Sequence, residues 1–181
     1  MLLAKPLRRI AVVLMMVSCG AYSHEAETNR ALIFKHKMTG YQDLGHCIRN
    51  HALRFQIPEW ILLSVLWQER GPRHGYLVNS DGTKDYGISC INDIRIKDLN
   101  QRGVAVTADM LMTDPCFAIG VTAYLLNFEM LQLSSNQRDW LTAAANYHYN
   151  IKGRYPQRHH KYKSQLITHL RSFQKIIASK T

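Results

Sequence analysis

Apolar residues recur at helical spacing along most of this chain of 181 residues. Between residues 43 and 55 they lie three and four positions apart, which gives a helix one apolar face. The stretch from Trp60 to Trp67 is apolar on every side, so a helix there has to be buried among other elements. The pattern predicts helices over residues 43–55, 58–69, 92–99, 115–133, 139–147 and 158–180, with a further turn starting at Thr107 or Asp109.

Glu69 ends the all-apolar helix, because Gly71 and Pro72 follow it and stop the helix there. The C-terminus of a helix carries partial negative charge, and apolar neighbours such as Trp67 make a carboxylate costly to desolvate. Both effects raise the pKa of a carboxyl group. The sequence therefore predicts a carboxylic acid that stays protonated near neutral pH, as a general acid must. The alternative is an exposed helix-terminal Glu without a role.

The segment after Glu69 carries a distinctive motif. Residues 79–83 read NSDGT, which is turn chemistry, and residues 85–92 read DYGISCIN. A helix-terminal Glu followed by N-x-D-G-[ST]-x-D-[YL]-G-[IL]-x-Q-I-N resembles the lysozyme-like superfamily. The resemblance covers residues 47–162 and is closest to the specialised lytic transglycosylases of type IV pilus, conjugation and type III secretion systems. It implies a mainly α, lysozyme-like α+β domain with a glycan-binding cleft and a small β-hairpin.

The resemblance also implies roles for individual residues. Glu69 becomes the catalytic acid and base. Substrate contacts are carried over to Asp85, Gly87, Ser89, Cys90, Asn92 and Tyr147. Two of these depart from the family, in which Met and Gln stand at the positions of Ser89 and Cys90, and the change alters part of the expected glycan surface.

Two of the carried-over residues have alternative interpretations. In chicken-type lysozymes the Asp of the matching turn is the second carboxylate, so Asp85 would be a nucleophile or would stabilise the oxocarbenium-like transition state. The alternative is an Asx-turn residue that binds local backbone N–H groups. Tyr147 would offer its ring to a sugar or its hydroxyl to a hydrogen bond near Glu69. The alternative is a core Tyr with its hydroxyl at the surface.

The implied activity is non-hydrolytic cleavage of the β-1,4 bond between N-acetylmuramic acid and N-acetylglucosamine, with a 1,6-anhydro product. The implied partners are peptidoglycan strands and the assembly proteins of a pilus or secretion apparatus. Two alternatives stay open: a lysozyme-type hydrolase that uses Glu69 and Asp85, and a peptidoglycan-binding assembly factor weakened by its changes at Ser89 and Cys90. No metal or organic cofactor is expected, and the adjacent His159 and His160 do not share a helical face.

Residues 1–23 are interpreted as a signal peptide, residues 24–40 as a loose lead-in and residues 41–181 as the transglycosylase domain. The first segment has a basic start, an apolar run at 10–17 and a small-x-small cleavage site ending at Ser23, which predicts a periplasmic protein. Eight apolar residues are too few to span a bilayer, which favours an exported protein. No integral membrane segment is expected in the mature chain. Lipoprotein processing at Cys19 is the lesser alternative, because Met16 stands where a lipobox has Leu.

Charge and cysteines complete the predictions. After residue 23 the chain keeps 20 basic against 13 acidic residues, which favours polyanionic partners. The basic residues are dispersed without stacking aromatics, so nucleic-acid binding is not expected. Three cysteines follow the signal segment, and an oxidising compartment would pair two of them in one of three ways. The resemblance implies the pair Cys47–Cys116, which leaves Cys90 as a thiol.

Overall fold

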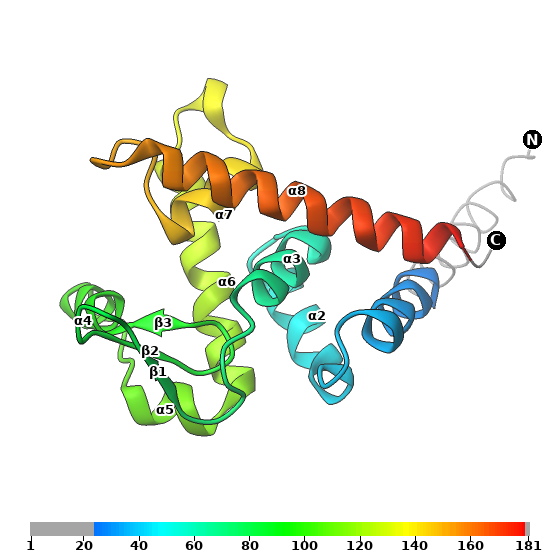
Figure 1. Cartoon of the computed structure of the whole chain (residues 1–181), viewed down its shortest axis with the longest axis horizontal. Coiled ribbons are helices and arrows are strands. Elements are labelled where there is room, and N and C mark those ends of the chain that lie inside the picture. The colour runs from blue at the N-terminus through cyan, green and yellow to red at the C-terminus, as the bar shows by residue number, and fades with distance from the viewer. Residues whose placement is uncertain (1–23, 180–181) are drawn as a thin grey trace, which may run out of the picture. The chain divides into compact units, whose positions relative to one another are not determined.

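The computed structural model describes residues 24–179 (Figure 1). Residues 1–23, which were predicted to be a signal peptide and include Cys19, lie outside the described residues. The chain divides into two compact units, one with residues 1–42 and 176–181 and the other with residues 43–175. In the first unit, residues 24–36 form a helix, and Ile33 and Met38 are fully buried. The expectation of a loose lead-in at 24–40 was therefore wrong, because apolar side chains order this segment.

The second unit is mainly helical, as predicted. Its core holds the two most apolar helices, α3 (Glu59–Glu69) and α6 (Pro115–Gln132), whose residues Leu62, Leu63, Ile119 and Leu126 are inaccessible to solvent. The helices α2 (Gly45–Arg54) and α7 (Trp140–His148) pack against α6. The helix α8 (Pro156–Ala178) carries the buried residues Tyr162, Leu166 and Phe173 on its apolar face. The remaining elements are η1 (Gln42–Leu44), α4 (Asp93–Gln101), α5 (Ala108–Thr113) and η2 (Ser135–Gln137).

Side-chain caps define where several helices begin. Asp114 accepts a hydrogen bond from the backbone N–H of Phe117, and Pro115 is the first residue of α6. Asp139 caps α7, and Thr107 caps α5. Pro58 lies one position earlier than predicted, at the N-cap of α3. Local sequence thus set these boundaries to within a residue or two.

The predicted hairpin is part of a three-stranded antiparallel sheet in the order β1 (Tyr76–Val78), β2 (Lys84–Tyr86) and β3 (Ile91–Asn92). In its register, Asp85 pairs with Leu77 on one side and with Asn92 on the other. The sheet and α4 lie apart from α7 and the start of α8, with α6 running between them (Figure 1). Within residues 24–179, no helix combines the length and the apolar character needed to cross a membrane.

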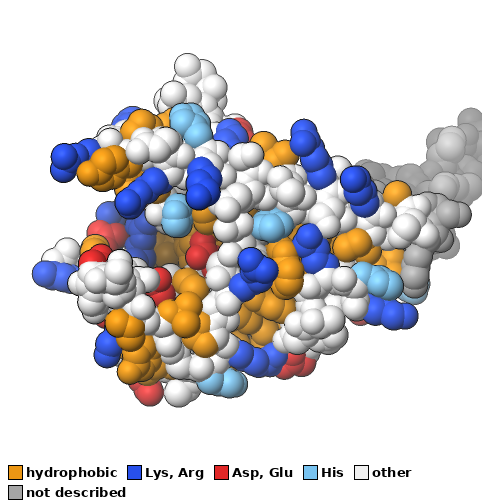
Figure 2. All heavy atoms as spheres, viewed as in Figure 1, with side chains coloured by type: hydrophobic (Ala, Val, Ile, Leu, Met, Phe, Trp, Pro, Cys, Tyr) orange, Lys and Arg blue, Asp and Glu red, His pale blue; other side chains and the backbone are white. Residues whose placement is uncertain are grey.

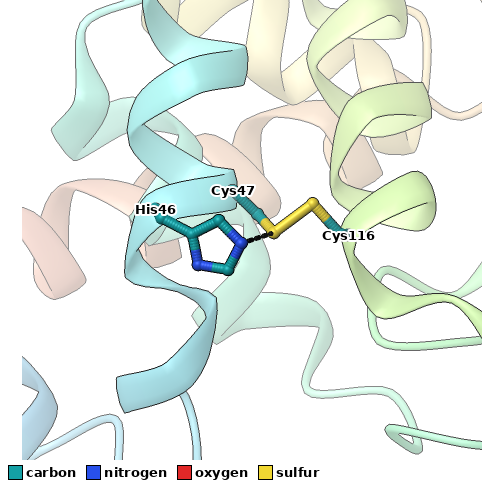
Figure 3. A group of neighbouring side chains, drawn as sticks. All are labelled: His46, Cys47 and Cys116. Carbon is teal, nitrogen blue, oxygen red and sulfur yellow. Dashed lines mark hydrogen bonds between the residues drawn. A yellow bond between two sulfur atoms is a disulfide. The ribbon is translucent and has the colours of Figure 1, made fainter.

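A disulfide joins Cys47 of α2 to Cys116 near the start of α6 (Figure 3), which is the pairing that the resemblance implied. The imidazole Nε2 of His46 lies 3.2 Å from Sγ of Cys47. In the described part of the chain, these three residues are the group of His, Cys and acidic side chains close enough together to share a metal ion. Because both sulfur atoms are bonded to each other, the group offers no thiolate ligand.

Candidate functional site

A cleft of about 800 Å³ opens between the sheet with α4 on one side and α7 with the start of α8 on the other. Figure 2 shows this hollow, with acidic side chains inside it and basic side chains at its mouth. Its volume falls within the range of small-molecule sites. The cleft is lined by Glu69, Asn79, Asp81, Thr83, Asp85, Cys90, Ile91, Asn92, Ile94, Arg95, Asp98, Arg102, Leu125, Tyr147, His148 and Arg158.

Glu69 is the last residue of α3, and its half-buried side chain borders the cleft. The helix ends there because Arg70 adopts the left-handed conformation with φ 43°. Burial raises the pKa of the Glu69 carboxyl to about 7; a hydrogen bond from Tyr162 opposes the rise, and the charge of Asp85 adds to it. Near neutral pH the group is therefore populated in both its protonated and its ionised form.

Tyr162 comes from α8 and donates a hydrogen bond from its hydroxyl to Oε1 of Glu69 at 2.5 Å. Its ring is stacked on the imidazole of His148, with ring centres 4.5 Å apart and planes 6° from parallel. Tyr162 falls within the helix predicted over residues 158–180, and the sequence pattern assigned it no role. Its hydroxyl was the overlooked signal, because a buried Tyr usually needs a polar partner.

Asp85 lies in the middle of β2 and borders the same cleft as Glu69. Its Oδ1 accepts a hydrogen bond of 2.8 Å from the side-chain amide of Asn92, which also donates to Oγ1 of Thr83. The Asx-turn alternative for Asp85 is wrong, because the backbone at this position pairs within the sheet. Asp81 has that role instead, since its Oδ1 accepts from the backbone N–H of Thr83 at 3.0 Å.

The predicted substrate contacts fall into two groups. Asp85, Cys90, Asn92 and Tyr147 line the cleft, whereas Gly87 and Ser89 do not. Ser89 is fully buried, and Gly87 packs so closely on the backbone of Leu111 that a Cβ would lie 2.2 Å from the carbonyl oxygen. These two residues were expected to contact the glycan directly. Their positions instead indicate a structural role behind the cleft wall.

Cys90 borders the cleft next to the catalytic candidate. Its Sγ lies 3.7 Å from the backbone oxygen of Glu69, and its backbone has a positive φ of 51°. Burial raises the pKa of the thiol to about 12, with smaller contributions from the charges of Glu69 and Asp85. Such a thiol is a poor nucleophile at neutral pH. Cys90 thus shapes the cleft without adding a reactive group.

Tyr147 is buried, and its hydroxyl donates a hydrogen bond of 2.8 Å to the carbonyl oxygen of Ser89. Its hydroxyl does not reach the surface, and the charge of Glu69 adds to burial in raising the pKa of Tyr147. The bond ties the C-terminal end of α7 to the loop between β2 and β3. Tyr147 therefore holds in place the segment that presents Cys90 to the cleft.

The cleft is also lined by three arginines that the sequence pattern did not identify. Arg95 lies 3.8 Å from a carboxylate oxygen of the buried Glu129 and donates to the carbonyl oxygen of Tyr147 at 3.3 Å. Arg102 pairs with Asp98 at 2.9 Å. Arg158 belongs to the first turn of α8. Their places at the cleft depend on how distant segments pack, so no local pattern could identify them.

Comparisons with known proteins give two relatives. The chain is 32% identical over 106 residues to "Protein IpgF" of Shigella sonnei, an alignment that covers 58% of this chain and 66% of that protein. It is 34% identical over 93 residues to "Protein IpgF" of Shigella flexneri, with 51% of this chain and 58% of that protein covered. The chain thus spans less than two thirds of the length of these relatives. No protein-family model matches the chain.

Proposed function

We propose that this protein is a peptidoglycan lytic transglycosylase of the lysozyme-like superfamily, with Glu69 as its catalytic acid and base. The single observation that carries the proposal is the Glu69 carboxyl, whose pKa is raised to about 7 at the wall of a cleft of about 800 Å³. A general acid works best when its pKa lies near the pH at which it operates. The same group then accepts a proton in the next step.

In the first step, protonated Glu69 donates its proton to the oxygen of the β-1,4 bond. The bond between that oxygen and C1 of the muramoyl residue breaks, and the N-acetylglucosamine side leaves as an alcohol. Because Tyr162 donates to Oε1, the other carboxyl oxygen is the one that carries the proton toward the cleft. Positive charge develops at C1, and the acetamido group of the substrate stabilises it.

In the second step, the Glu69 carboxylate takes the proton from the 6-hydroxyl of the same muramoyl residue. The 6-oxygen attacks C1, a 1,6-anhydro ring closes, and Glu69 is protonated again. No water is consumed, so one carboxyl group suffices for the complete cycle. The hydrogen bond from Tyr162 favours the carboxylate that forms between the two steps.

A lysozyme-type hydrolase is the second candidate, because Asp85 borders the same cleft and its charge contributes to the raised pKa of Glu69. In that mechanism, Asp85 would stabilise the positive charge at C1 or attack it. One oxygen of Asp85 already accepts a hydrogen bond from Asn92, which weakens its negative charge and favours the first candidate. The two mechanisms predict different ends on the cleaved strands.

We infer a secretion-system-related role from the similarity to the two Shigella proteins and from the resemblance to transglycosylases of such machines. Local cleavage of glycan strands would open the cell wall for the passage of the apparatus. Export to the periplasm through residues 1–23 would bring the enzyme to this substrate. Deleting the gene should reduce assembly of the apparatus, and an allele with Glu69→Gln should not restore it.

Mass spectrometry of fragments released from purified sacculi tests the activity. The wild-type protein should release fragments with 1,6-anhydro ends, and Glu69→Gln should release none. The matched control is Glu27→Gln, because Glu27 is exposed and lies outside the cleft. Fragments with reducing ends, together with a fall in activity of several orders of magnitude in Asp85→Asn, would support the hydrolase. Binding to sacculi without any release would refute both and support the assembly-factor alternative.

A further inference from the structure

The two walls of the cleft carry different charged side chains. On the wall formed by the sheet and α4, the sheet presents the carboxylates of Asp81 and Asp85, and α4 presents Arg95, Asp98 and Arg102. The opposite wall presents His148 and Arg158. Burial and the nearby Arg158 both lower the pKa of His148, which favours its neutral form. Arg158 is therefore the positive charge of this wall.

Arg158 differs from the two other arginines of the cleft in its partners. Arg95 and Arg102 both lie within 4.0 Å of Asp98, which neutralises part of their charge. Among residues 24–179, Arg158 forms no such ion pair. Its guanidinium instead lies over two aromatic rings, 5.1 Å from the centre of Tyr155 and 5.7 Å from the centre of Tyr149. A guanidinium that lies over aromatic rings keeps its planar fork of N–H donors, which matches the geometry of a carboxylate.

We propose that Arg158 binds a carboxylate of the glycan strand, so that the cleft selects strands with acidic substituents over neutral ones. The inference rests on the proposed function, because it concerns the substrate of the same cleft. Muramoyl residues carry a lactyl group whose carboxylate is either free or extended by a peptide with carboxylates of its own. Oligomers of N-acetylglucosamine lack all of these groups. A guanidinium recognises a carboxylate by two parallel hydrogen bonds.

The part of the sheet that carries Asp81 and Asp85 contributes to the same selection, because a carboxylate beside them would meet like charges. On the α4 side of this wall, Arg95 and Arg102 already lie within 4.0 Å of the carboxylate of Asp98. Arg158 is therefore the cleft arginine that forms no ion pair within residues 24–179.

Binding measurements with the Glu69→Gln variant test the inference, because this variant should bind the strand without cleaving it. Calorimetry would compare neutral N-acetylglucosamine oligomers, peptidoglycan strands with peptides, and strands from which an amidase has removed the peptides. Arg158→Gln should weaken binding of acidic strands about five- to tenfold, the effect of one charge-assisted hydrogen bond at a partly exposed site. It should leave binding of neutral oligomers unchanged. Arg154→Gln is the matched control, since Arg154 stacks on Tyr155 but lies outside the cleft lining.

The outcomes separate the two proposals. If Arg158→Gln also weakens the binding of strands without peptides, Arg158 binds the lactyl carboxylate. If it weakens only the binding of strands with peptides, Arg158 binds a peptide carboxylate. Both results support the inference. Equal losses of affinity for neutral and acidic ligands would overturn the inference, as would the same loss of affinity in Arg154→Gln. The proposed function would stand in both cases. If the Glu69→Gln protein binds none of the three ligands, the proposed function itself fails, and the inference fails with it.

Discussion

Tyr162 and Glu69 are joined by a hydrogen bond although 93 positions separate them in the chain. The tyrosine comes from the long helix α8 and the glutamate from the end of the buried helix α3. The bond favours the ionised carboxyl, whereas burial favours the protonated one, and burial has the larger effect on the pKa of Glu69. The balance between these two effects keeps the pKa near neutrality.

Replacing Tyr162 with Phe should raise the pKa of Glu69 above its value of about 7, because the hydrogen bond that lowers this pKa is lost. Activity that requires protonated Glu69 would then persist to higher pH. The pH profile of kcat/KM checks this through its alkaline limb. Tyr124→Phe is the control, because Tyr124 packs against Phe55 outside the cleft. An alkaline limb that stays in place or moves to lower pH would contradict the assignment.

Glu69→Gln should change how stability depends on pH. The pKa of Glu69 rises from 4.5 to about 7 on folding. The contribution of Glu69 to the free energy of unfolding is therefore fully present below about pH 4.5 and is lost as the pH rises through 7. The whole loss amounts to at most roughly 3 kcal/mol. Urea unfolding at pH 4.5 and pH 8 should show a smaller decline in the variant than in the wild type. A parallel decline in both would show that folding does not perturb this carboxyl.

Gly71→Ala should destabilise the protein by about 2–3 kcal/mol, because its Cβ would lie 2.2 Å from the carbonyl oxygen of Gly87 and 2.8 Å from Sγ of Cys90. Gly82 offers the contrast, since it has a φ of +84° but open space around it. Gly82→Ala should reduce the free energy of unfolding by only about 1–2 kcal/mol, because the left-handed backbone conformation is unfavourable for Ala. Urea unfolding compares the two, and equal losses would mean that the close approach at Gly71 relaxes at little cost.

Removing the disulfide through Cys47→Ser and Cys116→Ser together should reduce the free energy of unfolding by roughly 4 kcal/mol, because the bond closes a long loop. The two cysteines are 69 positions apart. A reducing agent should lower the melting temperature of the wild-type protein and leave that of the double variant unchanged. Equal melting temperatures for the oxidised and the reduced wild type would contradict a stabilising role.

Cys90→Ser should retain activity within about threefold, because the pKa of the thiol is raised to about 12 and almost no thiolate forms at neutral pH. For the same reason, iodoacetamide should label Cys90 slowly in the folded protein and quickly after denaturation. Muropeptide release and mass spectrometry of the labelled protein provide the two measurements. A loss of activity as large as that in Glu69→Gln would give the thiol a chemical role that its burial argues against.

The mainly helical fold, the helix boundaries and the candidate acid were all accessible from the sequence. Helix starts such as those at Asp114 and Asp139 depend on a side chain that caps its own N-terminus. The burial of α3 follows from an apolar run without a polar face. The place of Glu69 at the end of that run was likewise a local property, whereas its raised pKa depends on the elements that bury it. The pattern missed the helix at residues 24–36, because its first residues are mostly polar and its apolar residues form one block at 31–34 and do not recur at helical spacing.

Tertiary structure alone decided the surroundings of that acid. It set Tyr162 against Glu69, directed the hydroxyl of Tyr147 to Ser89 and moved Gly87 and Ser89 away from the cleft. It also left Arg158 stacked on two tyrosines at the cleft wall. Periodicity and caps act over a few residues, so the sequence by itself determined where helices form and where the acid lies. Contacts between segments far apart in the chain depend on how the helices pack, and the partners of the acid were therefore fixed only by the folded molecule.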